Sequence, residues 1–334
     1  MMTNRYGHLF ALATAATMLA ACGGAPMQNG AVVPQGASSQ SRTRPQHRSW
    51  MDLGLAKQDL LYVSNGDSEV TVYRYWQHTL VGVLTQFTQP KGECADAAGN
   101  VYITDSTAQR ILEFAHGGTK PIKSFDDSPD SPYTCSIDPT TGNLAVANQD
   151  GASQPGSIAI WKKGSSSPTR YTDSLLYYFE GCAYDANGNH LVTNGSRYPY
   201  GTYFAWLSKA GNKLINITVP GPDPSRAWGY VQGIQWDGKY FAIDDYAIYR
   251  IALIHGQAYY VGETDLDASG SNGPYWIYNN KPGSQGNQVV GGVNGDEDSV
   301  VNYWHYPSGG EPIFGLSHGI DNPFGVTVSL KQQK

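Results

Sequence analysis

The 334-residue chain has few charged side chains and no excess of basic ones. Asp, Glu, Lys and Arg make up 15% of the sequence, and the formal net charge is −6. Proteins that bind nucleic acid present a basic patch and often a high pI, so this composition argues against a nucleic-acid partner. After residue 30, no apolar run is long enough to cross a bilayer as a helix.

The short motifs of several enzyme classes are also absent. The eight His residues are scattered and form no HExxH pair. There is no Gly-x-Ser-x-Gly nucleophile elbow and no GxxxxGK[ST] phosphate loop. These absences argue against HExxH metallopeptidases, α/β-hydrolases and P-loop nucleotide hydrolases.

The N-terminal residues 1–21 have the composition of a signal peptide. Arg5 supplies a positive charge, and Leu9–Ala20 is an apolar segment too short to span a membrane. The segment ends Leu19-Ala20-Ala21-Cys22, which resembles a bacterial lipobox. The resemblance implies that Cys22 becomes the lipidated first residue, anchored in the cell envelope. Because Gly23 rather than Asp follows, it also implies the outer membrane. An ordinary signal peptide with a chance cysteine is the alternative.

Residues 22–49 are rich in Gly, Ala, Pro, Gln and Ser, and predict a flexible tether. We expect the remainder, residues 50–334, to form one domain. Gly and aromatic residues are plentiful in the chain, with 39 Gly, 23 Tyr and 8 Trp. This composition is typical of a turn-rich β protein.

The stretch 90–127 shows the unit from which the domain is built. It contains four short apolar runs separated by turns rich in Gly, Asn and Asp, which predict an antiparallel meander. Its length of about forty residues is that of a propeller blade.

The unit repeats six times in three independent alignments. The inner strands align at Gly92, Thr134, Gly181, Gly233, Trp276 and Gly325. The second strands align at 60–65, 100–105, 143–148, 189–194, 239–244 and 287–292. The third strands end at Tyr73, Phe114, Trp161, Trp206, Ile251 and Trp304. We therefore predict an all-β fold, a six-bladed β-propeller of four-stranded antiparallel blades. The aromatic column predicts packing between blades, with a ligand-stacking row as the alternative.

The phase of the repeat at the two ends predicts how the ring closes. The first ordered unit begins with a second strand near Leu60, and the last unit, Phe324–Leu330, is an inner strand alone. We expect the C-terminal strand to join the first blade, which leaves no open sheet edge.

The segments GNVYITD and ILEF resemble the repeat of NHL-type six-bladed propellers, over nearly all of 58–330. This resemblance implies the fold, which carries many functions. The nearest enzymes by fold are the gluconolactonase and regucalcin family, which holds a divalent metal with one Glu, two Asn and one Asp. Glu180-Gly181 is similar to a Glu-Gly element of that family. The equivalent positions in the other blades differ from its ligand set: Lys91, Tyr133, Gln232, Tyr275 and Phe324.

Polar residues recur where second strands end and inner strands begin, which we expect at one face of the disc. They form our candidate site around the channel: Asn65, Asp105, Asn148, Asn194, Asp244, Glu93 and Glu180. Such a ring could bind a polar ligand, and Ca²⁺ is a candidate cofactor. The alternative is local, because Asn and Asp at strand ends also bond their own backbone. Two acidic loops, at Asp67 and Asp296, are further candidates, with solvated turns as the alternative.

Three cysteines, Cys94, Cys135 and Cys182, lie on expected inner strands of successive blades. Counted back from the Asp that follows each strand, Cys135 and Cys182 share a register. Cys94 is offset by one residue and faces the other way. We interpret all three as small buried hydrophobic residues, and a catalytic thiol is the alternative.

These patterns favour a non-catalytic envelope lipoprotein, which binds a protein, peptide or glycan through the channel face of its propeller. We expect a monomer. The alternative function is a periplasmic metal-assisted hydrolase, lactonase or lyase that uses the acidic channel face.

Overall fold

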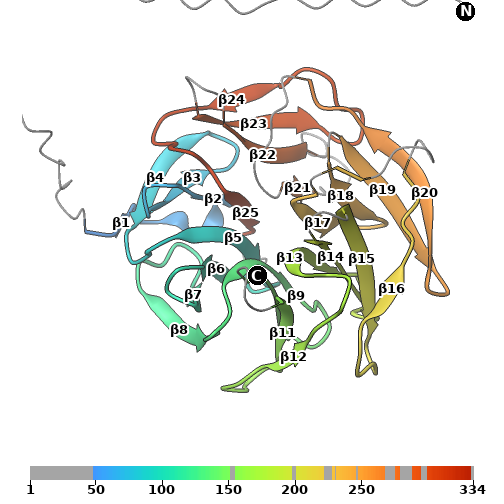
Figure 1. Cartoon of the computed structure of the whole chain (residues 1–334). Coiled ribbons are helices and arrows are strands. Elements are labelled where there is room, and N and C mark those ends of the chain that lie inside the picture. The colour runs from blue at the N-terminus through green and yellow to red at the C-terminus, as the bar shows by residue number, and fades with distance from the viewer. Residues whose placement is uncertain are drawn as a thin grey trace, which may run out of the picture. The chain divides into compact units, whose positions relative to one another are not determined.

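The computed structural model describes residues 48–150, 155–197, 201–221, 228–229, 231–245, 247–267, 275–278, 288–294 and 299–331, all within one compact unit that spans 45–334. Six antiparallel sheets follow one another around a ring (Figure 1). The six-bladed propeller predicted from the repeat is therefore confirmed. Cys22, the leader segment and Asp296 lie outside the described residues.

The first three blades are regular four-stranded meanders, apart from the chain closure in blade 1. Blade 1 contains β1 (Trp50–Met51), β2 (Leu60–Ser64), β3 (Val70–Arg74), β4 (Thr79–Leu84) and β25 (Gly325–Ser329). Blade 2 contains β5 (Pro90–Ala95), β6 (Val101–Asp105), β7 (Arg110–Phe114) and β8 (Pro121–Asp126). Blade 3 contains β9 (Pro132–Ile137), β10 (Leu144–Asn148), β11 (Ser157–Trp161) and β12 (Thr169–Tyr171).

The other three blades follow the same order from the channel outwards. Blade 4 contains β13 (Tyr178–Tyr184), β14 (His190–Arg197), β15 (Gly201–Ser208) and β16 (Ile215–Ile217). Blade 5 contains β17 (Gly233–Trp236), β18 (Phe241–Asp244), β19 (Ile248–Ile254) and β20 (Gln257–Thr264). Blade 6 contains β21 (Trp276–Tyr278), β22 (Gln288–Asn294), β23 (Ser299–His305) and β24 (Phe314–Leu316).

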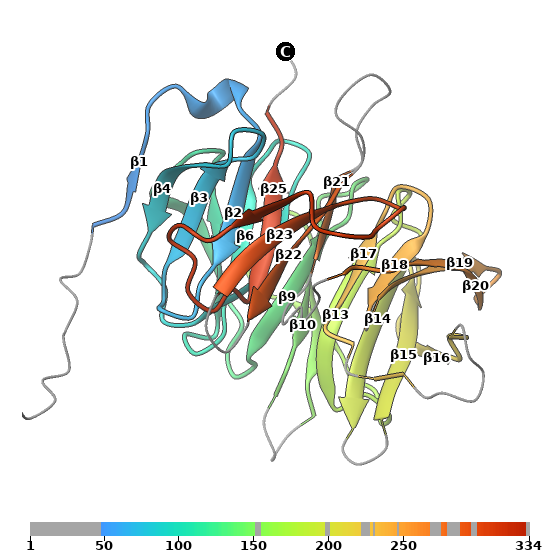
Figure 2. The ribbon, with the colours of Figure 1, turned by 90° about the horizontal axis from the view of Figure 1, so that it is seen from above.

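The C-terminal strand closes the ring, as the phase of the repeat predicts. Strand β25 pairs antiparallel with β2, from Leu60 opposite Ser329 to Ser64 opposite Gly325 (Figure 2). The first and last described segments of the propeller are also joined beside the closure, where the Lys331 backbone N–H donates to Asp59 Oδ1 at 2.9 Å. Blade 1 therefore uses both ends of the domain.

A short outer strand extends blade 1 beyond the four strands that the sequence predicts. Strand β1 pairs antiparallel with β4, and the Ser49 hydroxyl accepts a hydrogen bond from the Thr85 backbone N–H at 2.9 Å. The Met51 thioether occupies the space where a side chain on Gly82 would lie. Gly82 thus permits the close approach of β1. Besides the six sheets, the described residues contain one 3₁₀ turn, η1 (Leu55–Lys57). They contain no helix that could cross a membrane.

Aromatic side chains fill the spaces between blades. Tyr73, Phe114, Trp161 and Trp304 are fully buried, each in a cluster that contains residues of the preceding blade. Each ring of this size buries roughly 150–250 Å². For these four members, the expected packing role of the aromatic column is confirmed.

Candidate ligand-binding cavity in the central channel

The channel has two mouths that differ in their chemistry. Because the inner and second strands are antiparallel, Pro90 lies opposite Asp105, Pro132 opposite Asn148 and Gly325 opposite Ser64. We call the mouth where the inner strands begin the start mouth, and the mouth where they end the end mouth. The shared face expected for inner-strand starts and second-strand ends is the start mouth.

Local hydrogen bonds satisfy the predicted residues of the first two blades at the start mouth. Asn65 donates from Nδ2 to Thr71 Oγ1 at 3.0 Å and accepts from the Asp321 backbone N–H at 3.0 Å. Asp105 accepts from the backbone N–H groups of Thr88 and Gln89, at 3.0 and 2.8 Å. Its other oxygen forms a 3.0 Å salt bridge with Arg110. These contacts hold loops in place, as the local interpretation of strand-end Asn and Asp expects.

Asn148 and Asn194 are also buried, but each keeps one oxygen without a hydrogen-bond donor. Asn148 donates from Nδ2 to Asp130 and to the Ser157 hydroxyl, both at 3.2 Å. Asn194 donates to the Val231 carbonyl at 2.8 Å, which links blade 4 to blade 5. The buried Oδ1 atoms of both residues lack a partner in the described part of the chain.

Asp244 and Asp67 also lie on the start-mouth side, since Asp244 lies opposite Gly233 and Asp67 follows Asn65 by two residues. Asp244 is buried beside Tyr275 and Ile277 of the next blade, around a space of about 10 Å³ that is too small for a ligand. Asp67 is half-buried in the turn between β2 and β3.

The predicted set also contains two buried glutamates on inner strands. Glu93 accepts a 2.6 Å hydrogen bond from the Ser64 hydroxyl of blade 1, and Glu180 accepts one of 2.8 Å from Ser196. Burial raises the pKa of Glu180 to about 7 and that of Glu93 well above its usual value. The second oxygen of each is buried without a donor, so the neutral acid is favoured at both positions.

The start mouth does not fit the metal set of the gluconolactonase and regucalcin family. The inner strands bulge before Glu93, at Tyr133 and at Glu180, in the part of the repeat where that family places its ligands. The Lys91 ammonium lies 3.3 Å from the centre of the Phe324 ring, so a cation already occupies this region. Among the described residues, no group of three or more His, Cys, Asp or Glu could hold a metal ion. Calcium binding stays a prediction.

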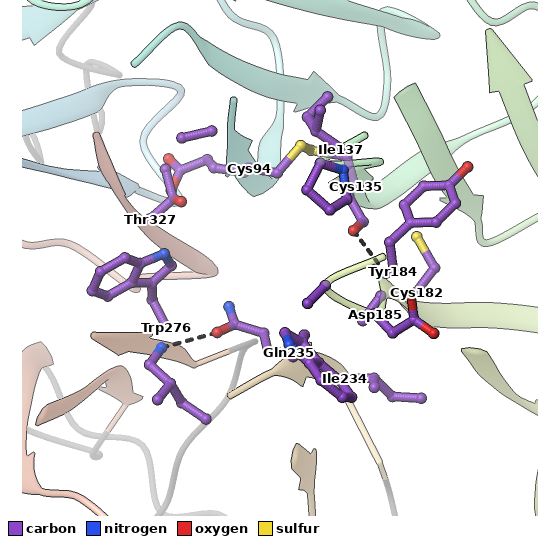
Figure 3. Close-up of a pocket in the computed structure, with 18 of the residues that line it drawn as sticks. Cys94, Cys135, Ile137, Cys182, Tyr184, Asp185, Ile234, Gln235, Trp276 and Thr327 are labelled. Carbon is purple, nitrogen blue, oxygen red and sulfur yellow. Dashed lines mark hydrogen bonds between the residues drawn. A yellow bond between two sulfur atoms is a disulfide. The ribbon is translucent and has the colours of Figure 1, made fainter. Parts of the chain in front are cut away.

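A cavity of about 510 Å³ opens at the end mouth, where all six inner strands contribute to its wall (Figure 3). This volume falls within the range of small-molecule sites. Of the seven residues of the predicted site, only Glu93 lines it. The structure thus brings the other six predicted residues to the start mouth and places the large cavity at the end mouth.

Three aromatic side chains and one amide side chain line the cavity. Tyr184, Trp236 and Trp276 line it and are each half-buried, so part of each ring remains accessible. The backbone N–H of Ile277 donates to Gln235 Oε1 at 2.9 Å, which ties blade 6 to blade 5. The backbone N–H of Tyr184 donates to the Ser136 hydroxyl at 3.1 Å, which ties blade 4 to blade 3. Side chains of one blade therefore satisfy the channel-facing edges of the next.

A disulfide between Cys94 and Cys135 forms another part of the wall. For Cys94 and Cys135, this corrects the interpretation of the three cysteines as small buried hydrophobic residues. The register offset of Cys94 is the reason: it faces blade 3, while Cys135 faces back to blade 2, and the two side chains meet in one core cluster. Cys182 of blade 4 also faces blade 3. The core cluster between these two blades contains Ala145, Ala147 and Ile158 of blade 3 and no second cysteine among the described residues. It is free, and burial raises its pKa to about 12, which disfavours a thiolate.

Sequence reasoning did not select Gln235, Trp236 or Trp276 as site residues. Gln235 and Trp236 immediately precede Asp237, which closes the inner strand of blade 5. The positions just before this repeated Asp lie at the end mouth in every blade where it occurs. The same alignment that pointed to the start mouth could therefore have pointed to these residues.

No family model matches the chain, and no curated protein matches it. Among solved structures, a chain from the nidogen/laminin complex is 13% identical, with a TM-score of 0.58; the match covers 83% of this chain and all of that one. A chain of hydrazine synthase from Kuenenia stuttgartiensis is 15% identical, with a TM-score of 0.44, over 73% of this chain and 62% of that one. At 13% identity, the likeness to the nidogen/laminin chain shows the propeller fold alone. The finer resemblance to NHL-type propellers stays a prediction.

Proposed function

We propose that the protein is a non-catalytic binding module whose ligand enters the cavity at the end mouth. One observation carries this proposal: a cavity of about 510 Å³ lined by partly accessible aromatic rings and an amide. An apolar pocket with a few convergent polar groups is the usual form of a ligand site. The links between blades keep its wall in place before a ligand arrives, which reduces the ordering cost of binding.

We further propose that the propeller works in the bacterial cell envelope, held by a lipid on Cys22, most simply at the outer membrane. The lipobox-like segment before Cys22 and the tether-like composition of 22–49 support this placement. The partner is then a protein, peptide or glycan of the envelope. The nidogen/laminin structure, which is a complex of two proteins, is consistent with a binding role for this fold.

Blocking the cavity tests the binding function. Ala186 is exposed and lines the cavity at a turn, so Ala186→Trp should fill the mouth without disturbing the core. We expect compounds from a panel of envelope sugars, peptides and lipids that raise the melting temperature of the full-length protein to lose that effect with Ala186→Trp. Ala98→Trp, on an exposed turn of blade 2 outside the cavity wall, is the matched control. If bound compounds stabilise the Ala186→Trp protein equally well, the site lies elsewhere.

Cys22→Ser tests the anchor separately. Without the thiol there is no atom to acylate, so the protein should leave the membrane fraction and no longer incorporate labelled fatty acid. Cys182→Ser is the control, because Cys182 is buried in the propeller. Fatty acid that still enters the Cys22→Ser protein would exclude this anchor.

A further inference from the structure

The wall of the cavity contains no basic side chain among the described residues, and its two acids are hydrogen-bonded within the protein. Among the described residues that line it there is no Lys, Arg or His, and the acids are Glu93 and Asp185. Asp185 accepts from the backbone N–H groups of Asn187 and Asn189 and from His190 Nδ1 at 2.7 Å. Glu93 is deeply buried and bonded to Ser64. An anion would lose its hydration here without gaining a counter-ion, and a cation would have to compete with His190 and two backbone N–H groups for Asp185, which disfavours both.

The orientation of the Gln235 amide is fixed by its neighbour. A backbone N–H can only donate, so the Gln235 atom that faces the Ile277 N–H at 2.9 Å must be the carbonyl oxygen. The NH₂ group is therefore turned the other way. Figure 3 shows it pointing towards the open centre of the cavity. Two hydrogen-bond donors are thus presented to a ligand.

The accessible aromatic rings supply the second half of the recognition. The face of an indole or phenol ring carries partial negative charge. Trp276 and Tyr184 stand on different sides of the cavity (Figure 3), and Trp236 also lines it. The C–H groups on the face of a pyranose ring carry partial positive charge, and its edge carries hydroxyl groups that accept from an amide. A sugar ring therefore matches an indole face and an amide donor at once.

A peptide matches the cavity less well. An extended peptide that binds by strand addition gains its affinity from hydrogen bonds to a bare strand edge. Here two edge N–H groups of the inner strands, those of Tyr184 and Ile277, already donate to Ser136 and Gln235. Sugar hydroxyl groups both donate and accept, and need no continuous strand edge.

We propose that the end-mouth cavity binds a neutral saccharide, with one ring stacked on Trp276 and a hydroxyl or carbonyl oxygen bonded to the Gln235 amide. This inference rests on the binding function proposed above and adds the chemical class of the ligand.

Calorimetric titration of the full-length protein in detergent tests the class directly. The probes are N,N′-diacetylchitobiose and maltotriose as neutral saccharides, end-blocked trialanine as a neutral peptide and spermidine as a cation. We expect at least one saccharide to bind and the other two probes not to bind. Binding of trialanine or spermidine more tightly than both saccharides, or no saccharide binding, overturns the inference. If a non-saccharide ligand binds and Ala186→Trp abolishes its binding, the binding function survives while the saccharide inference fails.

Two variants test the proposed contacts. Gln235→Glu keeps the oxygen that accepts from Ile277 and removes the NH₂ donors, so it should weaken saccharide binding about tenfold, as expected for one hydrogen bond. Trp276→Ala should weaken it by about tenfold or more through lost stacking. Trp50→Ala, which removes a Trp at the outer edge of blade 1, should leave binding unchanged. Tighter saccharide binding by Gln235→Glu would mean that the NH₂ donors are not used, and would overturn the proposed contact.

Discussion

The two mouths of the channel are built from the same repeated strands, yet their side chains have different roles. Those at the start mouth stabilise loops, and those at the end mouth line a cavity. At the start mouth, Asn65 and Asp105 form hydrogen bonds with nearby loops. At the end mouth, Gln235 and Trp276 border a cavity of about 510 Å³. The polar residues that repeat from blade to blade thus stabilise the loops of the start mouth. The residues that vary between blades line the end mouth, where the cavity can accept a ligand.

The physical reason lies in the position of each residue on its strand. An Asn or Asp just after a strand can reach the backbone of the following turn, so its side chain is used locally. Side chains near the end of an inner strand alternate between the two neighbouring blades, as Cys94 and Cys135 show. They link blades and leave their remaining surface to the channel.

Removing the disulfide should have the largest effect, because it joins two of the blades that form the end mouth. The bond spans a sequence separation of 41 residues, and a closed loop of that length corresponds to about 4 kcal/mol of unfolded-state entropy. We expect the double variant Cys94→Ala with Cys135→Ala to lose up to that free energy of unfolding in denaturant titrations. Cys182→Ala, which removes a free thiol from the adjacent core, is the control. A loss below about 1 kcal/mol, within the range of a typical single substitution, would show that the end mouth does not depend on this bond.

Removing Asp105 should have the next largest effect and should separate the two mouths. Asp105→Ala leaves two backbone N–H groups and Arg110 without their acceptor, which costs about 3 kcal/mol. We expect lower stability in denaturant titrations and unchanged affinity for a cavity ligand. Asp126→Ala, which removes an exposed acid that caps Ser128, is the matched control and should change stability little. Weakened ligand binding by Asp105→Ala alone would mean that the start mouth takes part in recognition.

The repeat made the fold predictable, because three alignments gave the same six units. The ends of the repeat also gave the closure of β25 on β2. The outer strand β1 was not predictable, since it is two residues long and depends on the missing side chain of Gly82. The disulfide is predictable in principle, because the offset of Cys94 makes it face blade 3, and facing positions of adjacent inner strands meet in one core cluster.

The cavity was harder to predict than the fold. The sequence shows which residues repeat, whereas the cavity depends on how much space six inner strands leave between them. Trp276 and Gln235 occupy positions where other blades carry different residues, so residue type does not mark them; only the position of Gln235, two residues before the repeated Asp, does. Glu93 was found because it is an acid on an inner strand, although its carboxyl group is bonded to Ser64.

The smallest predicted effect is the pH dependence of stability that arises from Glu180 at the start mouth. Burial raises the pKa of Glu180 from 4.5 to about 7, so the folded protein holds this proton more tightly than the unfolded chain. A raised pKa in the folded state stabilises at low pH, and that stability is lost as the pH rises through 7. Between pH 5 and pH 7 the contribution of Glu180 should fall by about 2 kcal/mol.

Glu180→Gln isolates this contribution, because the amide can still accept the hydrogen bond from Ser196 and does not ionise. The free energy of unfolding, measured by denaturant titration at each pH, should fall less steeply from pH 5 to pH 7 in this variant than in the parent protein. Glu263→Gln, at an exposed position on β20, controls for a general change in charge. Equal slopes in the parent and the Glu180→Gln protein would mean that Glu180 is ionised in the folded state. The start mouth would then hold a carboxylate, which is the group that a cation site at this mouth would need.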